Sequence, residues 1–171
     1  DTPSWRPALS PASMPSTATS GCRGTLPDPG FAGDLLARDC LSGDTVPAVI
    51  DSLREALKHV DQDLNSRFGD GTDIQQLVAA RAWAADQMLH FAWQQLMQQA
   101  GEVALLAVGG FGRGQLHPHS DIDLLFLYEA GDLPGSAREA IEQFITVLWD
   151  AGFYLGHSVR NLAQCYEEAA A

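Results

Sequence analysis

Two aspartates one residue apart, Asp121 and Asp123, stand at the head of an apolar run and are the residues best suited to do chemistry. In a β-strand, residues i and i+2 point to the same face, so the two carboxylates are expected together, with Ile122 and Leu124 turned toward the core. Like charges placed side by side are costly unless a cation compensates them. Such a pair suits a hard, oxygen-seeking cation such as Mg²⁺. The sequence therefore predicts a metal site, and a pair of solvated loop acids is the alternative.

A glycine-rich turn, "GGFGRG", precedes the aspartates and begins with Gly109 and Gly110. Glycines at the exit of a strand let backbone N–H groups approach a ligand closely, as phosphate oxygens require. The segment has neither the Gly-Lys-Ser/Thr of a Walker loop nor the GxGxxG spacing of a dinucleotide-binding turn. A tight structural turn explains these glycines equally well, so both interpretations stay open.

A helical hairpin is predicted upstream of this region, over residues 46–101. Apolar residues recur three and four apart from 46 to 68, which indicates one helix, and the "GDG" of 69–71 ends it. A second helix is predicted from Thr72 to 101. Thr72 and Gln75 fit a capping box at its start.

Three strands and a helix are predicted downstream. Continuous apolar runs indicate strands at 103–108, which has the composition of a central strand, and at 122–128. The stretch "FYLGHSVR", residues 153–160, is predicted as a third strand. Ser136 and Glu139 fit a capping box that opens a helix between the last two strands. This order predicts an α/β (α+β) fold in which the glycine turn and both aspartates lie at neighbouring strand ends.

The arrangement of strand, Gly-Gly, ten intervening residues and Asp-apolar-Asp resembles the signature of the DNA polymerase β-like nucleotidyltransferase superfamily. The stretches "GGFGRGQLHPHSDIDLLFL", "GHSVRNLAQC" and "LVAARAWAADQMLHFAW" are similar to the N-terminal part of the bacterial PII uridylyltransferase/uridylyl-removing enzymes. The resemblance covers residues 46–171. It implies a nucleotidyltransferase fold with a mixed sheet preceded by the hairpin 46–101, a catalytic α/β core over 102–171, and a domain that is incomplete at its C-terminus.

The resemblance also implies an activity: the Mg²⁺-dependent transfer of UMP from UTP to a tyrosine hydroxyl of the PII nitrogen-regulatory protein, with release of pyrophosphate. It assigns Gly109 and Gly110 to the UTP phosphates, and Asp121 and Asp123 to two Mg²⁺ ions. Two alternatives remain: another nucleotidyltransferase, which modifies a protein with AMP or acts on a small molecule, and a catalytically inactive nucleotide-binding regulatory module. The motifs do not specify the base.

Five further polar residues lie in or near these motifs. The resemblance assigns Ser120 and Arg113 as phosphate contacts, and a salt bridge that orders the loop is the alternative for Arg113. His117 and His119 flank Pro118, and a role in shaping the loop is favoured over a zinc site. For His157, a role in strand packing or hydrogen bonding is favoured over a role as a ligand.

The chain departs from the superfamily in one respect. Members of the superfamily use a third carboxylate from a later strand, and the predicted strand 153–160 has no acid. Asp150, Glu167 and Glu168 are the nearest acids along the chain, and none fits that position. The uridylyl-removing HD domain and the glutamine-sensing ACT domains of the family are also absent, so glutamine would act as an effector only through domains outside this chain.

Composition narrows the remaining possibilities. The net charge of −12, from 22 acidic and 10 basic residues among 171, disfavours nucleic acid and membrane surfaces as partners. Three widely spaced cysteines without a CxxC pattern predict reduced thiols and a cytoplasmic protein. Residues 1–45 are rich in proline and serine and lack apolar periodicity in their first 33 positions, which predicts a disordered tail.

Overall fold

The computed structural model describes residues 35–36, 41–129 and 131–170. Most of the predicted tail, residues 1–34 and 37–40, lies outside the described residues. Two residues assigned to that tail, Leu35 and Leu36, are buried in the hydrophobic core. The core therefore begins further toward the N-terminus than residue 46.

The predicted helical hairpin is present and consists of α2 (Val46–Gly69) and α3 (Ile74–Leu96). α3 starts later than expected, because Asp73, and not Thr72, caps it by accepting hydrogen bonds from the backbone N–H groups of Gln75 and Gln76. A carboxylate one residue further along satisfies the same free N–H groups that the predicted Thr72 cap would have served.

The sheet has three strands: β1 (Val103–Ala107), β2 (Ile122–Tyr128) and β3 (Leu155–Asn161). β2 is central, pairs antiparallel with β1 and parallel with β3, and so makes the sheet mixed. The prediction that the first strand is central is wrong, because β1 lies at the edge of the sheet within the described residues. Its alternating pattern of burial shows that only one face of β1 meets the core.

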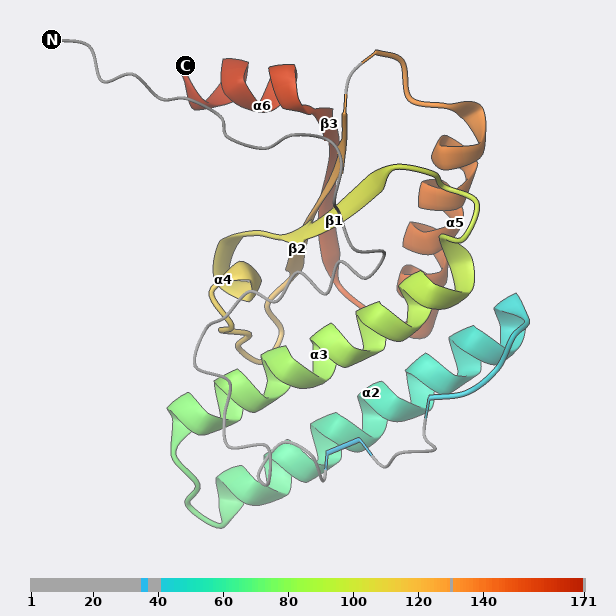
Figure 1. Cartoon of the computed structure of the whole chain (residues 1–171). Coiled ribbons are helices and arrows are strands. Elements are labelled where there is room, and N and C mark those ends of the chain that lie inside the picture. The colour runs from blue at the N-terminus through green and yellow to red at the C-terminus, as the bar shows by residue number, and fades with distance from the viewer. Residues whose placement is uncertain (1–34, 37–40, 130, 171) are drawn as a thin grey trace, which may run out of the picture.

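The helix α5 (Gly135–Ala151) links β2 to β3 and packs with α2 and α3 beside the sheet (Figure 1). It begins after Pro134 without a side-chain cap, so the predicted capping box of Ser136 and Glu139 is not formed. Trp93, Phe126 and Phe144 contact one another in the core, with ring centroids 5.7–6.4 Å apart. This aromatic cluster joins α3, β2 and α5.

Two further helices were not predicted. The short α4 (Gly109–Gly112) is formed by the glycine turn itself, and α6 (Leu162–Ala169) follows β3 directly. Asn161 and Gln164 form the capping box that starts α6. No helix in the described parts of the chain is both long and apolar enough to cross a membrane.

Candidate functional site

The glycine turn and the aspartates meet at one end of the sheet, where β1 ends and β2 and β3 begin. The backbone N–H of Val108 donates to the carbonyl oxygen of Asp123 over 3.0 Å, and that of Ile122 donates to the carbonyl oxygen of Tyr154 over 2.8 Å. Antiparallel pairing of β1 with β2 and parallel pairing of β2 with β3 place these three strand ends together. The neighbouring strand ends predicted from the sequence are thereby confirmed.

The two aspartates occupy different environments. Ile122 and Leu124 are buried, with 3% and 2% of their surface exposed, so Asp123 between them faces away from the helices. Asp123 is half-buried, whereas Asp121 precedes the strand and is exposed. The strand alternation therefore holds, and it presents Asp123 on the side of the sheet opposite the aromatic cluster.

Glycines stand on both sides of the Asp123 carboxylate. A Cβ atom at Gly109 would lie 2.7 Å from Oδ2, and one at Gly156 would lie 2.9 Å from Oδ1. Real Cβ atoms do not approach other atoms so closely, so neither position has room for a side chain while the carboxylate keeps this place. Gly109 also has a φ of 62°, in the left-handed region that favours glycine.

Neither aspartate carboxylate forms an ion pair or hydrogen bond with the protein in the described part of the chain, and the same holds for the Arg113 guanidinium. The loop-ordering salt bridge considered for Arg113 is therefore not found there. The oxygens of the two aspartates are left available to a cation. Mg²⁺ is commonly bound by one or two carboxylates together with substrate phosphates and water, so the pair fits it.

The backbone of the glycine turn offers donors beside the carboxylates. Among the residues that the structure describes, the N–H groups of Gly109, Gly110 and Phe111 find no acceptor, as is usual in the first turn of a helix. Such groups can approach phosphate oxygens. The assignment of Gly109 and Gly110 to a triphosphate stays a prediction.

The loop between the glycine turn and β2 lines a separate cavity of about 170 Å³. The residues that line it include His117, His119, Ser120 and Ile122. His119 has a φ of 65°, which agrees with the loop-shaping role expected of it. Ser120 is exposed and lines this cavity, and its contact with phosphate remains a prediction.

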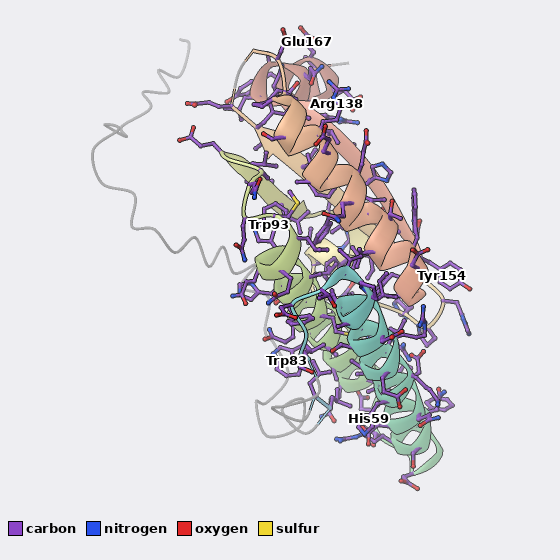
Figure 2. All side chains as sticks on the ribbon, turned by 90° about the vertical axis from the view of Figure 1, so that its right-hand side faces the viewer. His59, Trp83, Trp93, Arg138, Tyr154 and Glu167 are labelled. Carbon is purple, nitrogen blue, oxygen red and sulfur yellow. The ribbon has the colours of Figure 1, made fainter. Side chains whose placement is uncertain are left out.

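The three acids nearest to the missing third carboxylate do not join the site. Glu168 pairs with Arg160, which lies toward the far end of β3 from Asp123. Figure 2 shows Tyr154 and Glu167 at opposite ends of α5, with Tyr154 at the end where β3 begins. The backbone of Asp150 accepts a hydrogen bond from Arg54 on α2. No group of three or more His, Cys, Asp or Glu side chains suited to a metal occurs among the described residues.

Two other residues near β3 are now placed. The ring of His157 contacts Trp149 of α5 edge-on at 5.8 Å between ring centroids, as expected if it packs against its neighbours. Gly156 was not predicted as part of the site. Its signal in the sequence was a glycine inside a strand, which often marks a close approach of another group, but the approaching group could not be named before the strand pairing was known.

Comparison with known proteins identifies the type of domain. Residues 92–151 match the family model of the nucleotidyltransferase domain, a range that contains β1, the glycine turn and both aspartates. The chain contains a nucleotidyltransferase domain. The predicted fold class and the predicted assignment to the nucleotidyltransferases are confirmed.

The nucleotidyltransferase domain is similar to curated relatives that are each named a bifunctional uridylyltransferase/uridylyl-removing enzyme. The relative from Azotobacter vinelandii (strain DJ / ATCC BAA-1303) is 44% identical over 146 residues, which cover 85% of the chain and 16% of the relative. The relative from Ectopseudomonas mendocina (strain ymp) is 48% identical over 123 residues, or 71% of the chain and 14% of the relative. No solved structure gives a significant match to the chain.

These relatives confirm the resemblance to the uridylyltransferase/uridylyl-removing enzymes. The chain spans only 14–16% of the length of these two relatives. The nucleotidyltransferase domain is thus homologous to a small part of each of them.

Proposed function

We propose that this nucleotidyltransferase domain serves an enzyme that transfers UMP from UTP to a tyrosine hydroxyl of the PII nitrogen-regulatory protein and releases pyrophosphate. The relatives named as uridylyltransferases support the choice of UMP. One structural observation carries the proposal: the Asp123 carboxylate lies between two glycines, two positions after Asp121 in the chain, without a protein donor among the described residues. We also propose a cytoplasmic location, in keeping with the free thiol of Cys165.

Asp121 and Asp123 are the residues that would hold Mg²⁺. When bound, the metal would supply positive charge to the triphosphate and lower the pKa of the attacking hydroxyl. Two carboxylates are sufficient for this purpose when phosphate oxygens and water complete the coordination.

The chain's own residues bind and orient the nucleotide. The free N–H groups of Gly109 and Gly110 bind triphosphate oxygens, and the unpaired Arg113 adds a positive charge at the same turn. The tyrosine oxygen attacks the α-phosphorus in line. A phosphorus–oxygen bond forms as the bond to the bridging oxygen breaks, and pyrophosphate leaves.

The proposal is tested by titrating UTP calorimetrically into the chain, with and without Mn²⁺. Asp121→Asn and Asp123→Asn are each expected to weaken Mn²⁺-dependent UTP binding at least about tenfold, since even residues that only orient metal ligands cost that much. Glu139→Gln removes the same charge at an exposed position of α5 and is the matched control. Equal binding by the aspartate variants and the wild type would contradict the proposed site, and tighter binding of ATP than of UTP would contradict the choice of base.

A catalytically inactive, nucleotide-binding module is the second candidate, and one observation favours it. In the described residues, no third metal-binding side chain joins Asp121 and Asp123. The two candidate functions can be distinguished by incubating the complete enzyme with PII protein and UTP labelled at the α-phosphorus. Label on PII supports the transferase, whereas UTP binding without labelling supports the inactive module.

A further inference from the structure

Gly156 lies directly opposite Asp123 in the parallel pairing of β2 and β3. It sits inside an extended strand, and its φ is outside the left-handed region, so its backbone conformation does not require glycine. Glycine is a poor residue for the interior of a strand, because it loses more backbone entropy on folding and has no side chain to pack. The presence of glycine here therefore needs another explanation.

The Asp123 carboxylate supplies that explanation. A Cβ at position 156 would lie 2.9 Å from Oδ1 of Asp123, and it has no other neighbour within 4 Å. A shift of the Asp123 backbone cannot relieve this contact, because Ile122 and Leu124 on either side are buried in the core. A side chain at 156 would thus act on the carboxylate alone and rotate it away from β3.

The carboxylate is equally restricted on its other side. A Cβ at Gly109 would lie 2.7 Å from Oδ2, so the two oxygens face glycines from two different elements. No hydrogen bond to the protein holds the carboxylate in the described part of the chain. Its direction is consequently set by the space that the two glycines leave.

We propose that Gly156 is a positioning residue of the nucleotidyl-transfer site, which directs the Asp123 carboxylate toward the metal-bound nucleotide by leaving room for it against β3. This inference rests on the proposed function. It assigns a role to a residue outside the glycine turn and outside the aspartate pair.

The first test compares Gly156→Ala with the wild type in titrations of UTP at increasing Mn²⁺. We expect the Mn²⁺ concentration needed for half-maximal UTP binding to rise about tenfold or more, the size of effect seen when a residue that orients a metal ligand is changed. Gly135→Ala is the matched control, because a Cβ there meets nothing within 4 Å and its φ is not left-handed. It should bind as the wild type does.

The second test asks whether Gly156 acts through Asp123. Thermal melts are recorded for the wild type, Gly156→Ala, Asp123→Ala and the double variant. In the Asp123→Ala background Gly156→Ala should raise the midpoint, because alanine loses less backbone entropy than glycine and the carboxylate that would meet the new Cβ is gone. In the wild-type background the same change should raise the midpoint less, or lower it, because the new Cβ displaces the Asp123 carboxylate. This comparison remains informative if Gly156→Ala is destabilised.

The outcomes separate this inference from the proposed function. A wild-type chain that binds no Mn²⁺–UTP counts against the proposed function. Wild-type binding that depends on Asp123 but is unchanged in Gly156→Ala overturns the role of Gly156 and leaves the proposed function intact. A change in the midpoint of the same size in both backgrounds also overturns that role, because Gly156 would then affect β3 alone.

Discussion

Gly109 and Gly110 are adjacent in the glycine turn, but a side chain would meet different surroundings at each. Gly109 has a left-handed φ of 62° and lies against the Asp123 carboxylate. At Gly110 the φ is outside the left-handed region, and a Cβ would lie 3.2 Å from the carbonyl oxygen of Gln115, a contact that a shift of a few tenths of an ångström relieves. Gly110 is therefore the position where an effect on ligand binding can be separated from an effect on folding.

Gly110→Ala is predicted to stay folded and to lose most UTP binding, because its Cβ would obstruct a triphosphate that approaches the N–H group. Its stability should change by no more than about 1 kcal/mol, because the lower backbone entropy of unfolded alanine offsets the tight contact with the Gln115 carbonyl oxygen. Gly109→Ala should cost more, since a left-handed conformation adds about 1–2 kcal/mol for a residue with a side chain. Circular dichroism melts and calorimetric UTP titrations measure both quantities, and unchanged UTP affinity in folded Gly110→Ala would remove Gly110 from the site.

Part of the site could be read from the sequence because it depends on local geometry. The period of two in a strand placed Ile122 and Leu124 in the core and Asp123 opposite them, as observed. The contact between Asp123 and Gly156 could not be read in this way. It depends on the pairing of β2 with β3, and no local pattern specifies which residues of two distant strands lie side by side.

At the scale of elements, the aromatic cluster holds the central strand against the helices. Phe126 has no exposed surface and contacts Trp93 of α3 at 6.4 Å and Phe144 of α5 at 5.9 Å between ring centroids. Figure 2 shows Trp93 on α3, where that helix passes the sheet. Since β2 also carries Asp123, the cluster fixes the strand on which the site depends.

Phe126→Ala is predicted to lower the free energy of unfolding by about 3–5 kcal/mol, the usual cost of removing a buried aromatic ring. Phe126→Leu keeps most of the apolar volume and should cost less. Phe68→Ala is the control, because 63% of that side chain is exposed. Urea unfolding measures all three, and equal losses for Phe126→Ala and Phe68→Ala would contradict the role of the cluster.

The helices and strands that depend on a pattern of apolar residues could be predicted from the sequence. The helix starts that depend on a single hydrogen bond could not. Both long hairpin helices, all three strands and α5 were found from periodicity. The caps proposed at Thr72 and Ser136 were wrong, because neighbouring polar residues compete for the same backbone N–H groups and Pro134 starts α5 without a side-chain cap. α6 was missed, since none of its residues is buried and its start depends on the Asn161 capping box.

At the scale of the whole molecule, the fold extends into the region before the hairpin. Leu35 has no exposed surface, and its carbonyl oxygen lies 3.3 Å from Nδ1 of His59 on α2. Leu36 is 9% exposed and belongs to the same core. The boundary between dispensable and structural sequence is therefore expected just before Leu35.

Deleting residues 1–33 is predicted to leave the thermal midpoint nearly unchanged, because that stretch has no periodic apolar face. Leu35→Ala in the full chain should lower the midpoint by about 4 °C or more, since a buried leucine truncated to alanine costs about 2–5 kcal/mol. Differential scanning calorimetry of the two proteins tests this boundary. A large drop in the midpoint for the deletion would place the boundary before residue 34. No drop for Leu35→Ala would place it after Leu35.

The parallel pairing of β2 and β3 has a consequence for the order of folding. Antiparallel β1 and β2 are joined by a short connection, whereas β3 can reach β2 only after α5 has crossed between them. Contacts across a longer loop are slower to form. As the chain leaves the ribosome, the hairpin and the β1–β2 pair can assemble first, and Asp123 then has Gly109 on one side and water on the other. We expect Gly156 to close the second side only when β3 docks, so the site would be completed after β1 and β2 have paired.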